Sequence, residues 1–134
     1  MKKNRVQILI AALVLLLVTL ACEFSASTAK IQEVWMSTDE AGEQRTTTFA
    51  PDAVFYAQVD LRNAPDDTNL KAVWTAVEVE GAEPNLVLAE TDFTSGSGTV
   101  TFNLKNDQLW PAGKYRVEIY LNGKLDKPVD FEVQ

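Results

Sequence analysis

Strict alternation of apolar and polar side chains is the feature that most constrains the fold of this chain. It is clearest over residues 114–121, where aromatic and β-branched residues fall at every second position. A period of two is typical of a strand with one buried face. It recurs, with varying strength, over residues 31–36, 53–61, 69–80, 86–93, 99–104 and 129–133, and no helix-period segment interrupts these runs. Residues 31–134 are therefore predicted to form about seven strands and no helix.

The breaks between these runs contain residues that favour turns. Residues 63–67 read Asn-Ala-Pro-Asp-Asp, and residues 95–98 read Ser-Gly-Ser-Gly. Asn122 and Gly123 predict a hairpin, because both tolerate a positive φ. Strands separated by short breaks of this kind predict an all-β domain, either a two-sheet sandwich or a small barrel.

Two aromatic residues favour the sandwich. Trp74 falls on the inward face of the third predicted strand, where immunoglobulin-like sandwiches place a core tryptophan. Tyr115 lies at the start of the sixth strand and resembles the tyrosine corner, whose hydroxyl bonds to upstream backbone. With one cysteine the chain lacks the disulfide of antibody domains, so it resembles bacterial and fibronectin III-like sandwiches. The resemblance implies an immunoglobulin-like two-sheet β-sandwich over residues 31–134, with Trp74 and Tyr115 as structural residues.

The first 21 residues have the three parts of an export signal. Lys2, Lys3 and Arg5 precede an apolar run of 11 residues at 8–18, and a small residue ends the segment. The run is shorter than the roughly 20 residues that a membrane-spanning helix needs, and it fits the apolar part of a signal peptide. Residues 1–21 are therefore predicted to be a helical, cleaved signal peptide. A retained N-terminal membrane helix is the alternative.

Residues 19–22, Thr-Leu-Ala-Cys, resemble the lipobox of bacterial lipoproteins. In that family the cysteine thiol receives a diacylglycerol, and cleavage then makes this cysteine the N-terminus. The family prefers leucine at the position of Thr19, and this chain has its leucine one place later. The resemblance implies acyl chains such as palmitate on Cys22 and a flexible tether over residues 22–30. It also implies a place in the cell envelope, on the outer side of the cytoplasmic membrane or on the outer membrane. An ordinary signal with a chance cysteine is the alternative.

Charge and composition exclude several classes of function. The chain has 12 Lys and Arg against 19 Asp and Glu, and loss of the leader would lower its net charge from −7 to −10. Such a surface repels nucleic acid and anionic lipid, so membrane attachment would depend on the acyl chains. The absence of histidine excludes His-based triads, and the single cysteine excludes Cys/His zinc sites. We therefore expect no enzymatic activity and no cofactor.

A carbohydrate- or calcium-binding module is the alternative to a protein-binding domain. Asp60, Asn63, Asp66 and Asp67 lie in one strand-to-loop stretch and offer oxygen ligands to calcium, although ordinary turn chemistry also explains them. Trp35, on a predicted edge strand, is a candidate platform for a sugar ring.

The outward face of the sheet that holds Trp74 is the predicted interaction surface. The third, sixth and seventh strands of immunoglobulin-like sandwiches share one sheet. Period two then turns valines, a tyrosine and an arginine outward among charged residues, and aromatic and arginine side chains are enriched at interfaces. The set comprises Val73, Thr75, Val77, Arg116, Glu118, Tyr120, Asp130 and Glu132. We predict that Val73, Thr75, Val77, Arg116 and Tyr120 contact a protein partner; an ordinary solvated face is the alternative.

Overall fold

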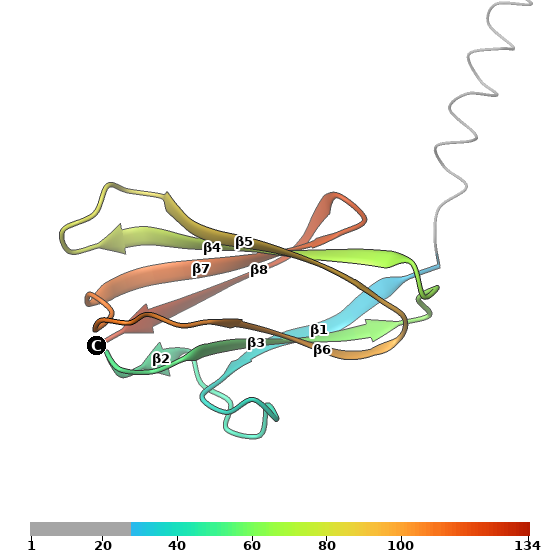
Figure 1. The fold of residues 1–134 in the computed structure, drawn as a ribbon, viewed down its shortest axis with the longest axis horizontal. Coiled ribbons are helices and arrows are strands. Elements are labelled where there is room, and N and C mark those ends of the chain that lie inside the picture. The colour runs from blue at the N-terminus through green and yellow to red at the C-terminus, as the bar shows by residue number, and fades with distance from the viewer. Residues whose placement is uncertain (1–27) are drawn as a thin grey trace, which may run out of the picture.

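The computed structural model describes residues 28–134, which form two β-sheets packed face to face (Figure 1). The strands are β1 (Lys30–Ser37), β2 (Thr48–Phe49), β3 (Phe55–Arg62), β4 (Thr68–Val79), β5 (Leu86–Ser95), β6 (Gly98–Leu104), β7 (Gly113–Leu121) and β8 (Lys124–Val133). The described residues contain no helix, and so none that could span a membrane. The predicted signal peptide, Cys22 and the tether as far as residue 27 lie outside the described residues.

The strands divide unequally between the sheets. The smaller sheet has the order β1-β3-β6, and the larger has the order β2-β8-β7-β4-β5. Only the short β2 runs parallel to its neighbour, β8. The two-sheet, all-β prediction is confirmed, and the barrel alternative is wrong. All seven predicted strands are present, and β2 is an eighth that is too short to show a period of two.

An aromatic cluster fills the space between the sheets. Phe55 is fully buried, and its ring centroid lies 4.4 Å from that of Trp110 and 4.8 Å from that of Phe131. Trp74 is 1% exposed and stacks at 6.3 Å on the same Phe55 ring. Aromatic pairs at these spacings contribute about 0.5–1.5 kcal/mol beyond the area they bury. The inward facing predicted for Trp74 is therefore observed, and this cluster joins the two sheets.

Tyr115 fixes the start of β7. Its ring is buried, and its hydroxyl donates a hydrogen bond of 2.6 Å to the carbonyl oxygen of Pro111. Burial raises the pKa of the Tyr115 hydroxyl, because the phenolate would lose its hydration. Gly113 allows the close approach of this corner to β4, since an added Cβ would lie 2.4 Å from the carbonyl oxygen of Glu78. The contact is the hydrogen bond expected of a tyrosine corner.

The segment after β1 covers part of the outward face of the smaller sheet, around Gln58. Gln58 points to this face but is only 1% exposed, since its amide donates 2.9 Å to the carbonyl of Glu40 and 3.3 Å to the Ser37 hydroxyl. The Thr101 hydroxyl donates a hydrogen bond of 2.6 Å to the side-chain carbonyl oxygen of Gln58. Gly42 packs so closely that an added Cβ would lie 2.9 Å from Gln58 Cγ. The buried amide is thus satisfied and holds the segment in place.

Candidate interaction surface

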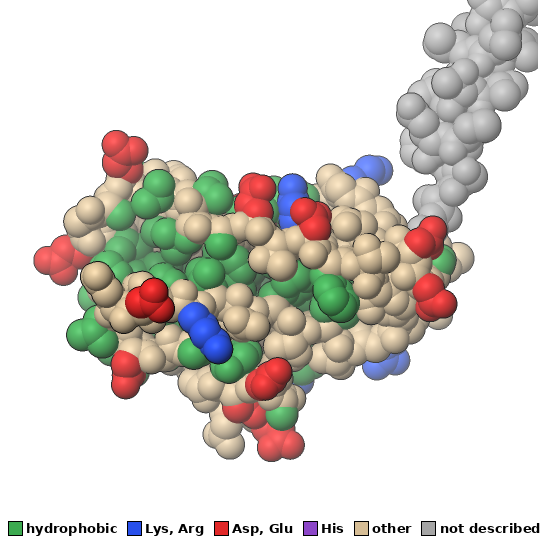
Figure 2. Space-filling model, viewed as in Figure 1, with side chains coloured by type: hydrophobic (Ala, Val, Ile, Leu, Met, Phe, Trp, Pro, Cys, Tyr) green, Lys and Arg blue, Asp and Glu red, His purple; other side chains and the backbone are tan. Residues whose placement is uncertain are grey.

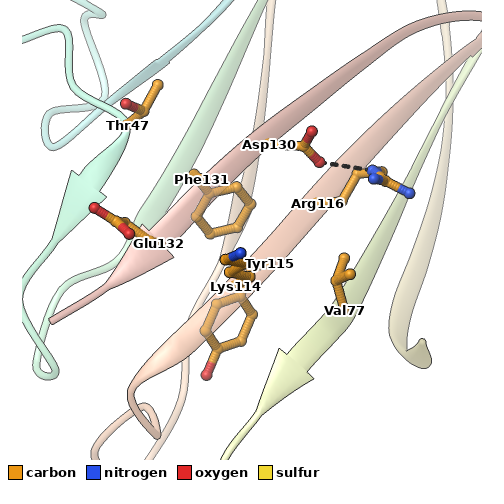
Figure 3. Close-up of a pocket in the computed structure, with 8 residues that line it drawn as sticks. All are labelled: Thr47, Val77, Lys114, Tyr115, Arg116, Asp130, Phe131 and Glu132. Carbon is orange, nitrogen blue, oxygen red and sulfur yellow. Dashed lines mark hydrogen bonds and ion pairs between the residues drawn. The ribbon is translucent and has the colours of Figure 1, made fainter. Parts of the chain in front are cut away.

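An open groove of about 460 Å³ lies against the larger sheet, at its β2-β8-β7-β4 end (Figure 3). Figure 3 shows Thr47 at one side of the groove, and Val77 on β4 and the Arg116–Asp130 pair at the other. The lining residues are Thr47, Val77, Lys114, Tyr115, Arg116, Asp130, Phe131 and Glu132. The rings of Tyr115 and Phe131 belong to the core, so the outward polar side chains define the chemistry of the groove.

Strand register places these polar side chains in two rows. The antiparallel pairing of β7 and β8 sets Lys114 opposite Glu132 and Arg116 opposite Asp130. Residues directly opposite each other project from the same face of a sheet. On β4 the pairing with β7 shifts between Ala76 and Glu78, so that Val77 has no partner on β7. This irregularity leaves Val77 half-buried at the edge of the groove.

The groove contains both positive and negative side chains, and of its two cations only Arg116 forms an ion pair with a described residue. Arg116 Nε lies 2.7 Å from Asp130 Oδ1, and the two side chains are 38% and 73% exposed. The hydrogen bond to Asp130 holds the pKa of Arg116 above its usual value. Glu132 accepts hydrogen bonds from Gln134 at 3.0 Å and from Thr48 at 3.4 Å. Lys114 is exposed and makes no ion pair with any described residue.

This arrangement suits recognition of a charged or polar surface. Arg116 is oriented by the Asp130 carboxylate and still has guanidinium N–H groups to donate, while the Lys114 ammonium offers three donors. Val77 adds an apolar contact beside them. Arginine is enriched at protein interfaces, and their rims are polar and accessible.

The prediction that Val73 and Thr75 belong to an exposed patch is wrong. Both point outward, but they are only 6% and 8% exposed. β4 lies between β5 and β7, and Val73 stands between Glu90 and Glu118 in the two ladders. Side chains of both neighbouring strands therefore cover the centre of this face. Thr75 is buried in the same way, between Val87 and Arg116.

The remaining residues of the predicted face are partly accessible. Tyr120 is half-buried, and the Lys71 ammonium lies 4.9 Å from its ring centroid, a cation–π contact. Glu118 is half-buried beside it. The sequence reasoning missed Lys114, although it lies two residues before Arg116 on the same face. It also missed Thr47, because nothing in the local pattern reveals β2.

The four candidate calcium ligands do not converge on one site, and those with hydrogen bonds have different partners. Both Asp60 oxygens accept hydrogen bonds from Arg62, at 3.0 and 3.1 Å, and these bonds lower the pKa of Asp60. Asn63 has a positive φ of 52° at the end of β3, and its carbonyl accepts a hydrogen bond from Thr28. Asp66 and Asp67 are exposed. Among the described residues, no three His, Cys, Asp or Glu side chains gather in a way that could hold a metal ion.

Trp35, the candidate sugar platform, is partly covered. Its indole Nε1 donates 3.0 Å to the carbonyl of Gly42, and the Arg45 guanidinium lies 4.3 Å from the ring centroid. Arg45 is held there by an ion pair of 2.5 Å with Glu33. A sugar ring would therefore have to displace Arg45 to stack on that side of the indole.

The comparisons with known proteins concern the fold. No family model matches the sequence, and no curated protein is similar to it. An immunoglobulin-like protein from Pseudomonas aeruginosa is similar in structure, with 15% identity and a TM-score of 0.52 over 79% of this chain and 96% of its own. The alkylpurine DNA glycosylase AlkC of Pseudomonas fluorescens gives 11% identity and a TM-score of 0.53 over 81% of this chain. This chain spans only 31% of the length of that enzyme.

A β-glucosidase from Listeria innocua has a TM-score of 0.47, with 18% identity over 79% of this chain and 16% of its own. At these identities the likeness shows the fold alone. The described residues form an immunoglobulin-like β-sandwich.

Proposed function

We propose that this chain is a lipid-anchored, extracytoplasmic binding domain without catalytic activity. In this proposal Cys22 carries the acyl chains, and residues 28–134 bind a protein partner at the cell envelope through the outward face of the larger sheet. The anchor rests on the leader and the lipobox-like residues 19–22 of the sequence. The net negative charge argues against nucleic acid as the partner.

The groove beside Arg116 is the observation that carries the binding role. It holds an oriented arginine, an unpaired Lys114 and the half-buried Val77 on a face that no described segment covers. On the outward face of the smaller sheet, in contrast, the segment that contains Gly42 covers the region around Gln58. A partner would therefore find accessible, chemically varied side chains on the larger sheet.

The anchor is tested by metabolic labelling with a radioactive fatty acid. Cys22→Ala should remove the label completely, because the chain has no other thiol. Equal labelling of the variant and the parent would contradict the lipoprotein proposal, whatever the result at the groove.

The binding surface is tested by site-specific photo-cross-linking in intact cells. A photoreactive residue at Val77 should give an adduct with one partner, whereas the same residue at the exposed Asn103 on β6 should not. Neutralisation of Lys114 and Arg116, both to Gln, should abolish the Val77 adduct and lower the urea midpoint only slightly, because Arg116 and Asp130 form an exposed ion pair. Equal adducts at Val77 and Asn103, or an adduct that survives the neutralisation, would refute this surface.

A further inference from the structure

β5 is a free edge of the larger sheet. It pairs with β4 on one side and ends the strand order on the other (Figure 1). An edge strand leaves alternate backbone N–H and C=O groups without a ladder partner, and these groups can pair with another strand. The strand has no proline or lysine to prevent this; its protective feature is a shift in register next to Leu88. From Ala89 to Ser95 the pairing is regular, which is the length of an ordinary strand.

The inward side of β5 has apolar side chains that the domain leaves uncovered. Leu86 pairs with Ala76, and Phe93 pairs with Leu70, so both turn toward the inner side of the sheet. Their partners are 2% and 0% exposed, yet Leu86 and Phe93 are 43% and 50% exposed. The smaller sheet has fewer strands and ends at β6, so β5 extends beyond it. Figure 2 shows hydrophobic side chains gathered on this side of the sandwich.

The outward side of β5 has two carboxylates without ion pairs. Glu90 and Asp92 are exposed, and neither has a cation within 4.0 Å among the described residues. Lys71 stands opposite Asp92 in the ladder, but its ammonium lies over the Tyr120 ring instead. The edge therefore combines apolar side chains on its inner side with unneutralised negative charge on its outer side.

The other sheet edges lack this combination. On β6 the inward side chains Val100 and Phe102 are already buried, at 6% and 4% exposure. The edge of β1 is occupied at its end, where Thr46 N donates to the Met36 carbonyl and Arg45 bridges to Ser37. β2 is two residues long. Among the described strands, β5 is thus the edge at which an added strand would bury new apolar surface.

A second copy of this chain is a poor occupant of the edge. Antiparallel pairing of β5 with itself in the regular stretch would set Glu90 and Asp92 close to the same residues of the copy. Like charges opposite each other destabilise a strand pair. The complementary occupant has cationic side chains at those positions and apolar side chains at the alternate ones.

We propose that β5 binds an extended segment of a partner protein in which apolar and basic residues alternate. The segment adds to the larger sheet as a sixth strand, its backbone pairs with the free groups of β5, and its apolar residues cover Leu86 and Phe93. Its Lys or Arg side chains lie beside Glu90 and Asp92. This site uses different residues from the groove at Arg116 and goes beyond the function proposed above.

The direct test is titration of the 134-residue chain, in detergent, with a capped peptide of about nine residues that alternates valine with lysine. Saturable binding is expected at peptide concentrations up to about 1 mM, with slower hydrogen exchange in β5. The same peptide with N-methyl groups on alternate residues along one edge should lose binding, because the ladder cannot form. Two versions, one methylated on each edge, cover both orientations. A peptide that alternates valine with glutamate should bind at least about tenfold more weakly.

The variant Glu90→Lys/Asp92→Lys supplies the charge-reversal test. It should weaken the valine–lysine peptide about tenfold or more and bind the valine–glutamate peptide better than the parent chain does. Glu40→Lys/Glu43→Lys is the matched control, since it changes net charge equally on the exposed segment after β1. This control should stay within about twofold of the parent, because its charges are remote and screened.

Three results would overturn the proposal. One is the absence of saturable binding by the valine–lysine peptide. Another is equal loss of binding in the control and β5 variants, which would indicate attraction by net charge alone. The third is self-association of the parent chain in sedimentation that the β5 variant changes, which would make a second copy the occupant.

Discussion

Replacement of Tyr115 by phenylalanine isolates the contribution of one hydrogen bond to the stability of the sandwich. The ring would keep its packing, including the stacked contact with Phe131 at 5.6 Å. The variant would lose only the 2.6 Å donation to the Pro111 carbonyl and leave that oxygen without this donor. Such a loss costs about 1–2 kcal/mol. With a urea slope of about 1–2 kcal/mol/M, the unfolding midpoint of Tyr115→Phe should fall by about 1 M at pH 7.

The effect of Tyr115→Phe should depend on alkaline pH in a defined direction. Burial raises the pKa of the Tyr115 hydroxyl in the folded state above the value of about 10 of an exposed tyrosine. Above pH 10 the folded state therefore holds a proton that the unfolded state releases, so stability falls as pH rises. The contribution of the hydroxyl is fully present below pH about 10 and is lost as pH rises through the folded-state pKa. The stability gap between parent and variant should narrow in that range.

Tyr56→Phe is the matched control for this experiment. Tyr56 is half-buried, and its hydroxyl has no hydrogen-bond partner in the described structure. Its replacement should change the free energy of unfolding by no more than about 0.5 kcal/mol. Equal midpoints for Tyr115→Phe and the parent, or an equal loss in Tyr56→Phe, would show that the corner hydrogen bond does not support the fold.

Three further substitutions, Trp74→Ala, Gly42→Ala and Gln58→Ala, test the packing by urea unfolding, the first two each beside a control variant. Trp74→Ala should cost about 3–5 kcal/mol by emptying the core, while Trp74→Phe should cost much less, because the buried Trp74 Nε1 has no partner to lose. Gly42→Ala should cost more than Gly81→Ala: both have a positive φ, but an added Cβ meets Gln58 only at Gly42. Gln58→Ala should cost about 2–3 kcal/mol, since the groups that hydrogen-bond to the Gln58 amide are left without their partner. A loss of less than about 0.5 kcal/mol in Trp74→Ala, Gly42→Ala or Gln58→Ala would contradict the packing described.

Much of the fold could be predicted from the sequence because one face of most strands is buried. Residues such as Tyr115 and Val117 alternate with polar neighbours on β7, and this alternation fixed both the strand and its facing. The sequence did not reveal which side chains of β5 point toward the core. The side chains of this strand are exposed on both sides, so burial selected no period of two along Leu86–Ser95. β2 was missed because two residues cannot show a period.

The candidate surface was predicted less completely, because exposure is set by neighbouring strands. Alternation gives the direction of Val73 and Thr75 correctly, but it cannot show that β4 lies between two strands whose side chains bury them. That information lies in the order of strands, which pairs segments far apart in the chain. The opposition of Arg116 and Asp130 depends likewise on the register of β7 against β8. The predicted turn at Asn122 and Gly123 would by itself set Arg116 opposite Val129, because it does not reveal the register shift between Ile119 and Tyr120. The contribution of Thr47 could not be foreseen either.

The unequal division of strands explains why recognition should be sought on the larger sheet. The part of the smaller sheet's outward face around Gln58 is closed by residues 38–45, which are held by the hydrogen bonds of Gln58 and by the Trp35 indole. To expose it, a partner would have to break buried hydrogen bonds, each costly to leave unmade. The larger sheet needs no such opening, because its groove is already accessible and its last strand, β5, extends beyond the smaller sheet. Binding there costs the domain little reorganisation, which favours affinity.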